Sequence, residues 1–244
     1  MSWPTWLPLR EALRPLSPYG APQVPAIAAL NTNENPYAPS PVLQKAITDA
    51  VAKVAADLNR YPDRDATILR EKLAQYINEQ SATKFSLDNI WAANGSNEII
   101  QSIFLAFAQG CVLGFTPSYS MHPLIAKTTG SKWIDGKRNA DFSLNTADAV
   151  AQILVNKPTL TFITSPNNPT GGAVTIDSIQ KLADAAKQVG GLLVVDEAYA
   201  EFSQEKSAVT LIASNPHVIV IRTMSKAFAF AGARLGYLVS DSAV

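Results

Sequence analysis

The sequence has 244 residues but only one cysteine and two histidines, and this scarcity excludes several kinds of site. Cys111 has no second cysteine with which to form a disulfide within the chain, which is typical of proteins from a reducing compartment. A cysteine-based zinc cluster is excluded for the same reason, and His122 and His217 are too few for a histidine-rich metal site. We therefore expect no metal site and a cytoplasmic protein.

The sequence also lacks an excess of charge and a long apolar run. Twenty Lys and Arg residues balance 20 Asp and Glu residues, whereas proteins that bind nucleic acids or anionic membranes usually carry a basic excess. No apolar stretch approaches the roughly 20 residues that span a bilayer, and the first residues do not resemble a signal peptide. We expect no nucleic acid or membrane partner. Since 47% of the residues are hydrophobic, we do expect a sizeable buried core.

Two phosphate-binding fingerprints are missing. The sequence contains neither G-x-x-x-x-G-K-[ST] nor G-x-G-x-x-G, which disfavours a P-loop NTPase and a dinucleotide-binding protein. A Ser-His-Asp hydrolase is disfavoured because His217 precedes a predicted strand and His122 lies beside Pro123. We expect both histidines to be structural.

The hydrophobic pattern alternates between strands and helices. Helical spacing begins at Pro41, where seven apolar residues between Val42 and Val54 share one face, and a second helix should turn Ile68, Leu69, Leu73 and Ile77 inward. The other predicted helices lie at 99–107, 147–155 and 176–186, and the predicted strands at 90–93, 112–115, 132–135, 159–164, 192–195, 218–221 and 235–239. This order predicts an α/β protein with a mostly parallel sheet covered on both faces, in three α/β/α layers. We expect residues 1–40 to form an N-terminal arm and loop, and residues 41–244 one large domain.

Polar residues gather where the predicted strands end. Lys226 follows the β-branched run 218–221, Asp196 and Tyr199 follow the strand at 192–195, and Asn168 follows the strand at 159–164. Open α/β sheets place their ligand sites at the carboxyl ends of strands. A lysine at such a position can be desolvated, which lowers its pKa as a Schiff-base lysine requires.

Small polar residues also follow the strand at 90–93. Gly95, Ser96 and Asn97 come directly before a helix, an arrangement that points backbone N–H groups at an anion. An ordinary N-cap by Ser96 or Asn97 explains the same residues. Arg234, eight positions after Lys226, could bind an anion held nearby.

A cofactor with an aldehyde, a pyridine ring and a phosphate would use all of these residues. Lys226 would form the Schiff base, Asp196 would hold a proton on the ring nitrogen, and Tyr199 and Asn168 would bond the phenolic oxygen. Tyr119 would stack on the ring. The phosphate would lie among small polar residues and one arginine, namely Gly95, Ser96, Asn97, Thr223, Ser225 and Arg234.

Several motifs carry a family resemblance. The segments 168–171 (Asn-Pro-Thr-Gly) and 196–199 (Asp-Glu-Ala-Tyr), and Ser225-Lys226 followed by Arg234, resemble the signature of fold-type I pyridoxal-phosphate aminotransferases. The segments 33–37, 60–63, 94–98 and 223–228 resemble, more narrowly, the histidinol-phosphate aminotransferases. The resemblance covers residues 16–239. It implies pyridoxal 5′-phosphate as cofactor, and histidinol phosphate and 2-oxoglutarate, an amino-acid phosphate and a 2-oxo acid, as small-molecule substrates. Lys226 would be the Schiff-base lysine and proton shuttle, and Asp196 and Tyr199 catalytic residues that contact the ring.

The resemblance also implies a homodimer, because Tyr61 matches a tyrosine that reaches the cofactor phosphate of the partner subunit. Members of the family continue for another hundred-odd residues into a small C-terminal domain with a substrate-binding arginine, and we expect that domain to be absent from this chain. Three other functions stay open on the sequence: an aromatic amino-acid aminotransferase, a threonine-phosphate decarboxylase, and a non-catalytic fragment that dimerises.

Overall fold

The computed structural model describes residues 3–17, 20, 25 and 30–244, so positions 1–2, 18–19, 21–24 and 26–29 of the predicted N-terminal arm lie outside the described residues. The described chain forms one seven-stranded sheet in the order β1-β7-β6-β5-β4-β2-β3. Its strands are β1 (Ile90–Ala93), β2 (Cys111–Thr116), β3 (Lys132–Lys137), β4 (Leu160–Thr164), β5 (Leu192–Asp196), β6 (Val218–Thr223) and β7 (Gly236–Val239). Only β7 runs antiparallel to its neighbours, β1 and β6. The prediction of a mostly parallel sheet is confirmed.

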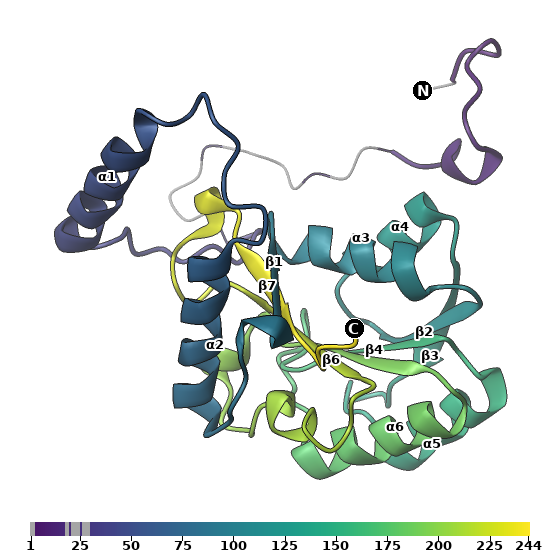
Figure 1. Ribbon diagram of the computed structural model, residues 1–244. Helices are drawn as coiled ribbons and strands as arrows, with labels where there is room; N and C mark the ends of the chain where they lie inside the picture. The colour runs from purple at the N-terminus through teal and green to yellow at the C-terminus, as the bar shows by residue number, and fades with distance from the viewer. Residues whose placement is uncertain (1–2, 18–19, 21–24, 26–29) are drawn as a thin grey trace.

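Helices cover both faces of the sheet, as Figure 1 shows. Helices α3 (Ser96–Phe107) and α4 (Met121–Thr129) lie on one face, and α5 (Thr146–Asn156) and α6 (Ile176–Gln188) lie on the other. Helix α2 (Thr67–Ser81) packs near β1, and short 3-10 turns occur at Glu11–Leu13, Leu87–Asn89, Ala200–Phe202, Ala208–Leu211 and Ala231–Ala233. The expected three-layer α/β/α arrangement is therefore present.

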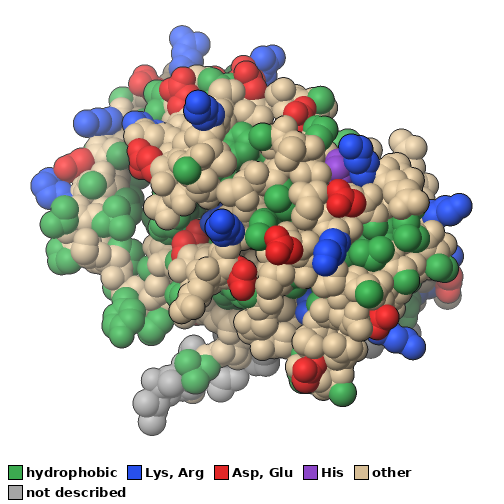
Figure 2. All heavy atoms as spheres, turned by 90° about the horizontal axis from the view of Figure 1, so that it is seen from below, with side chains coloured by type: hydrophobic (Ala, Val, Ile, Leu, Met, Phe, Trp, Pro, Cys, Tyr) green, Lys and Arg blue, Asp and Glu red, His purple; other side chains and the backbone are tan. Residues whose placement is uncertain are grey.

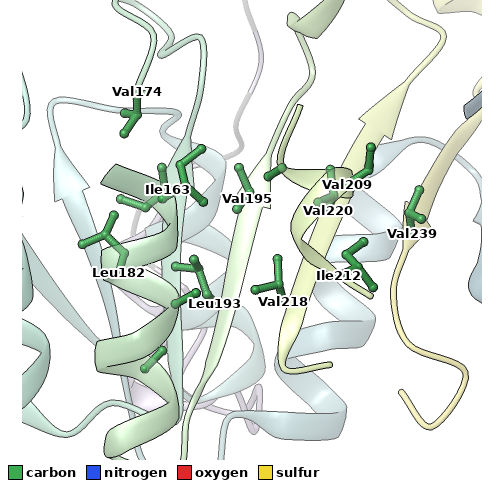
Figure 3. Close-up of a cluster of buried hydrophobic side chains, with 14 of the residues drawn as sticks. Ile163, Val174, Leu182, Leu193, Val195, Val209, Ile212, Val218, Val220 and Val239 are labelled. Atoms are coloured by element: carbon green, nitrogen blue, oxygen red, sulfur yellow. The ribbon is translucent and has the colours of Figure 1, made fainter. Parts of the chain in front are cut away.

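The side-chain alternation along β6 divides the core between the two faces. Val218 and Val220 pack with α6 in one cluster, part of which is drawn in Figure 3, whereas Ile219 and Ile221 pack with α3 in the other. All four side chains are fully buried. Burying one such side chain stabilises the fold by about 1.5–3 kcal/mol. Because the apolar residues of β6 face both sides of the sheet, helices pack on both sides of the strand that precedes Lys226.

The first two helices bury less than the sequence predicts. Helix α1 (Pro41–Ala55) begins at an N-cap formed by Ser40, but none of its residues is buried, and it projects from the body in Figure 1. In α2, Leu73 and Ile77 are buried, but Ile68 is 75% exposed and Leu69 is 37% exposed. The prediction that Ile68 and Leu69 turn inward is wrong, because the sheet reaches only the later turns of this helix.

The hydrophobic pattern of the sequence did not predict one helix, α4. Helix α4 has only nine residues, and Pro123 lies within it. Proline fits in the first turn of a helix, where its missing N–H leaves no bond unmade. The helix ends at Thr129, and the C-cap residue Gly130 has a φ of 84°, the left-handed conformation that glycine adopts readily. This short helix places His122 beneath the candidate site.

Charged side chains of both signs alternate over the face seen in Figure 2. Hydrophobic side chains gather at the left edge of that view, the side from which α1 projects in Figure 1. Among the described residues, no helix combines the length and the apolar character needed to cross a membrane.

Candidate functional site

A cavity of about 770 Å³ lies at the carboxyl ends of β4, β5 and β6, where α3 begins. Parallel strands end at the same edge of a sheet, so this edge brings together residues that are distant in the sequence. Ten of the predicted site residues line the cavity: Ser96, Asn97, Tyr119, Asn168, Asp196, Tyr199, Thr223, Ser225, Lys226 and Arg234.

The amine of Lys226 is half-buried inside this cavity. Its Nζ donates a hydrogen bond of 2.9 Å to the backbone oxygen of Thr32 and lies 5.9 Å from the centre of the Tyr199 ring. Burial lowers the pKa of Lys226 and Arg234 lowers it further, while the carboxylate of Glu34 acts in the opposite direction. The lysine is thus shifted toward the neutral form that attacks carbonyl carbons.

Asp196 is buried with 1% of its surface exposed and is held from two sides. The Nε2 atom of His122, itself 1% exposed, lies 3.0 Å from Asp196 Oδ2, and the backbone N–H of Ala198 donates to Oδ1 at 3.1 Å. These contacts fix the orientation of the carboxyl group at the floor of the cavity. The expectation that His122 is merely structural misses its contact with a site residue.

Two side-chain amides donate hydrogen bonds to the hydroxyl of Tyr199. Asn33 Nδ2 donates to it at 3.0 Å and Asn168 Nδ2 at 3.4 Å. Burial raises the pKa of Tyr199, an effect that the hydrogen bond from Asn33 opposes. The phenol therefore stays protonated at neutral pH and can act as a hydrogen-bond donor.

Small hydroxyl residues and an arginine line the opposite wall. Thr223 Oγ1 donates to Ser225 Oγ at 3.0 Å, and Arg234 Nη1 lies 3.4 Å from the same Ser225 oxygen. Gly95 has a φ of 87°, and a Cβ built on it would lie 2.3 Å from Arg234 Nη2. The guanidinium therefore lies close to the backbone of Gly95, and the positive φ is the reason why this position favours glycine.

Helix α3 begins at this wall without a side-chain cap. Its N-cap residue is Gly95, and no side chain accepts a bond from the first N–H groups. The alternative that Ser96 or Asn97 caps the helix is wrong, because both residues already lie inside its first turn. Backbone donors, a helix N-terminus and Arg234 thus converge on one point, an arrangement that suits a phosphate group.

The two remaining predicted tyrosines, Tyr119 and Tyr61, differ in their placement. Tyr119 lines the cavity, donates its hydroxyl proton to Asn97 Oδ1 at 3.2 Å, and meets the His122 ring edge-on with a centroid distance of 5.4 Å. Tyr61 is fully exposed and lies outside the cavity lining. Within one chain, the fold does not bring Tyr61 to the site.

The cavity also contains residues that the sequence analysis did not select. Thr32, Asn33 and Glu34 lie over Lys226, and Ser118 and Thr164 share a hydrogen bond of 2.9 Å at the cavity wall. The segment 33–37 contributed to the family resemblance, and this was the available signal for Asn33 and Glu34. No signal in the sequence indicated Ser118, because hydroxyl residues near a turn are common.

Taken together, the residues fit a pyridine aldehyde that carries a phosphate. A half-buried amine, a buried carboxylate and a phenol lie around one cavity, with an anion-binding corner beside them. Among the described residues, no cluster of three or more His, Cys, Asp and Glu side chains could hold a metal ion.

Comparison with known proteins agrees with this geometry. Residues 26–244 match the family model described as aminotransferase class I and II. A histidinol-phosphate aminotransferase of Mycobacterium sp. (strain KMS) is 51% identical over 241 residues, which cover 98% of this chain and 63% of that protein. The chain therefore spans less than two thirds of the length of this relative.

Solved structures show the same fold. The histidinol-phosphate aminotransferase from Clostridium acetobutylicum is 25% identical with a TM-score of 0.70, and the match covers 86% of this chain and 59% of that one. The histidinol-phosphate aminotransferase from Sinorhizobium meliloti, in complex with pyridoxal-5'-phosphate, is 24% identical with a TM-score of 0.70, over 87% and 56% of the two chains.

Proposed function

Because the chain belongs to the class I and II aminotransferase family, we propose that it binds pyridoxal 5′-phosphate and transfers an amino group between histidinol phosphate and 2-oxoglutarate in histidine biosynthesis. One observation carries the proposal: the half-buried amine of Lys226 shares a single cavity with Asp196, Tyr199 and Arg234. The name of the Mycobacterium relative supports the substrate. The lone cysteine supports a cytoplasmic location.

Lys226 is the proposed attachment point and proton carrier. When bound, the cofactor supplies an aldehyde that condenses with amines and a ring that accepts electrons. A neutral amine is needed both to attack an aldehyde and to accept a proton from a substrate carbon. Burial of Lys226 favours that neutral form.

Asp196 and Tyr199 are the other proposed catalytic residues. The carboxylate of Asp196, oriented by His122, would keep a proton on the pyridine nitrogen. The phenol of Tyr199, together with Asn168, would bond the ring hydroxyl. Tyr119 would cover one face of the ring.

The anion-binding corner would hold the phosphate. Arg234 supplies a positive charge, and Thr223 and Ser225 supply hydroxyl donors. The first N–H groups of α3, at Ser96 and Asn97 beyond Gly95, would complete the contacts.

A second copy of the chain is the proposed partner. Tyr61 is fully exposed here, and Val42, Leu43, Val51 and Val54 of α1 are also exposed. In a homodimer these surfaces would be buried and Tyr61 would reach the phosphate of the other subunit. We also infer that residues 41–244, including α1, belong to one cofactor-binding domain that follows the arm at 1–40.

Covalent labelling tests the cofactor part of the proposal. The chain is incubated with pyridoxal phosphate, reduced with borohydride and digested, and the peptides are mapped by mass spectrometry. We expect the pyridoxyl group on Lys226 and no label in Lys226→Ala. A label on other lysines, in proportion to their exposure, would contradict the assignment.

The substrate part requires an activity measurement. Glutamate formation from 2-oxoglutarate is followed with histidinol phosphate, phenylalanine or threonine phosphate as the second reactant. The fastest reaction is expected with histidinol phosphate. A preference for phenylalanine, or release of carbon dioxide from threonine phosphate, would favour the alternative enzymes.

A further inference from the structure

A second cavity lies directly behind the candidate site. The carboxyl ends of β5 and β6 present neighbouring residues to opposite faces of the sheet, since side chains alternate along a strand. Asp196 and Thr223 line the candidate site, whereas Arg222 lines a separate cavity of about 930 Å³. Glu197 follows Asp196 directly and pairs with Arg222 on this rear side. The sheet is thus the wall between the two cavities.

Glu197 and Arg222 form a buried ion pair across β5 and β6. Glu197 is 3% exposed and Arg222 is 5% exposed. Arg222 Nε donates to Glu197 Oε2 at 2.9 Å, and Nη2 lies 2.7 Å from the same oxygen and donates to Ser207 Oγ at 3.0 Å. Ser207 Oγ donates to Glu197 Oε2 at 2.7 Å, and the N–H of Ala208 donates to Oε1 at 2.7 Å. Both carboxylate oxygens are therefore held.

Further contacts link this ion pair to the segments that follow β5 and β6. Arg222 Nη1 contacts Glu201 Oε1 at 3.0 Å, two residues after Tyr199. The hydroxyl of Tyr76, from α2, donates to the same Glu201 oxygen at 3.4 Å. The Tyr76 ring meets Phe228 edge-on at 5.7 Å, two residues after Lys226. We call Tyr76, Glu197, Glu201 and Arg222 the rear cluster.

The rear cluster depends on the guanidinium at its centre. Burial by itself lowers the pKa of Arg222, but Glu197 first, and then Tyr237 and Glu201, outweigh burial and leave that pKa raised. Two carboxylates share one positive charge, so loss of Arg222 would leave both without a countercharge. A planar guanidinium with several donors can satisfy both at fixed angles, whereas a lysine ammonium cannot.

We infer that the rear cluster is a positioning device for the cofactor site, because it sets the relative placement of the strand ends that carry Asp196 and Lys226. This inference rests on the proposed function. None of the four side chains of the rear cluster lines the candidate site, so they are positioning residues rather than catalytic ones. Their effect on the cofactor passes through the backbone of β5 and β6, whose ladder continues at Glu197 N–H to Ile221 O at 2.9 Å.

The test measures how the chain holds pyridoxal phosphate. The dissociation constant is measured by absorbance titration, and the circular dichroism band of the bound cofactor reports its orientation. For Arg222→Met we expect a dissociation constant raised about tenfold, the order of one charged hydrogen bond, and an altered band. The dissociation constant of Arg222→Lys should lie between those of Arg222→Met and the parent, because lysine keeps the positive charge but lacks the planar guanidinium with its several donors.

A matched control separates positioning from stability. Arg70 is another partly buried arginine, which donates to the backbone oxygens of Ile90 and Leu87 and lies outside both cavities. Arg70→Met should lower the thermal midpoint but leave the cofactor band and its dissociation constant unchanged. If Arg222→Met fails to fold, Arg222→Lys and the milder Glu201→Gln decide, each with an expected weakening of about threefold.

The outcomes distinguish the two proposals. Folded variants of Arg222 and Glu201 with the parental dissociation constant and band would overturn the role of the rear cluster, while Lys226 labelling in the parent keeps the proposed function intact. If Arg70→Met raised the dissociation constant and altered the cofactor band as much as Arg222→Met does, the role of the rear cluster would also be overturned. Both effects would then reflect a loss of stability alone. If the parent takes up no label on Lys226, the proposed function fails and this inference falls with it.

Discussion

At the scale of single residues, the site depends on contacts between groups that are far apart in the sequence. Asp196 and His122 are 74 positions apart, yet their side chains share a buried contact of 3.0 Å. Together with the backbone N–H of Ala198, which donates to Oδ1, this contact fixes the orientation of the carboxyl group in the cavity. Neither residue could hold this geometry alone.

Replacement of Asp196 by asparagine should separate binding from turnover. The amide keeps the size of the side chain but cannot stabilise a protonated ring nitrogen. We expect Asp196→Asn to retain cofactor binding and to lose transamination by roughly 10²-fold or more. The rate of glutamate formation and a cofactor titration measure the two effects, and comparable turnover in variant and parent would assign Asp196 another role.

His122 should contribute to stability as well as to orientation. His122→Phe leaves the buried Asp196 Oδ2 without this partner, which costs about 1–3 kcal/mol. Urea denaturation should show that loss, and His122→Gln, which keeps a donor, should recover part of it. Equal stability of all three proteins would show that the contact is not needed.

The pKa of Lys226 gives a prediction with a definite sign. Burial lowers this pKa below the ordinary value of 10.5, so the amine should react with acetic anhydride at lower pH than a lysine in an unstructured peptide. The charged amine is disfavoured in the folded state, so stability should rise with pH between the lowered pKa and 10.5. Glu34→Gln removes an influence that raises the pKa, and should move the reactivity midpoint further down. A midpoint moved upward would contradict this assignment to Glu34.

At the scale of secondary-structure elements, α1 and β6 contrast in how their apolar residues are used. In β6, both faces of the strand are covered by helices of the same chain. In α1, Val51 is 59% exposed and Val54 is 57% exposed, although both lie in a regular, capped helix. An apolar face of this kind is typical of an interface.

Substitutions on the apolar face of α1 should therefore change the oligomeric state of the protein. We expect Val51→Glu and Val54→Glu to shift a homodimer toward monomer by about tenfold or more, since a charge would replace an apolar contact. Sedimentation velocity over a range of concentrations measures the shift. Lys53→Glu, between the two valines on the same helix, is the matched control and should have little effect. A monomer–dimer balance equal in all variants would count against the proposed dimer surface.

At the scale of the whole molecule, cofactor binding should stabilise the fold. The proposed contacts come from β5, β6, the loop after β4 and the start of α3, so bound cofactor would tie these elements together. At 100 times the dissociation constant, binding adds about 2.7 kcal/mol. For a protein of this size, this corresponds to a rise of roughly 5–10 °C in thermal midpoint.

Arg234→Met should reduce that rise with little change in the midpoint of the cofactor-free chain, because Arg234 is exposed and its hydrogen bonds go only to Ser225 and Ala231. Differential scanning calorimetry with and without pyridoxal phosphate measures both quantities. An undiminished rise would remove Arg234 from the phosphate contacts.

The sequence alone predicted the sheet, all of its covering helices except α4, and ten of the residues that line the cavity. It could do so because buried parallel strands require continuous apolar runs, and polar residues directly after such runs must collect at one edge of the sheet. The motifs around Lys226 and Asp196 added the family resemblance.

Only the tertiary structure decided how those residues are held. The contact of His122 with Asp196, the placement of Thr32 over Lys226, and the ion pair of Glu197 with Arg222 join segments that no local pattern connects. The exposure of α1 could not be predicted from the sequence either. The same apolar helical pattern occurs whether the helix packs against its own chain or against another one.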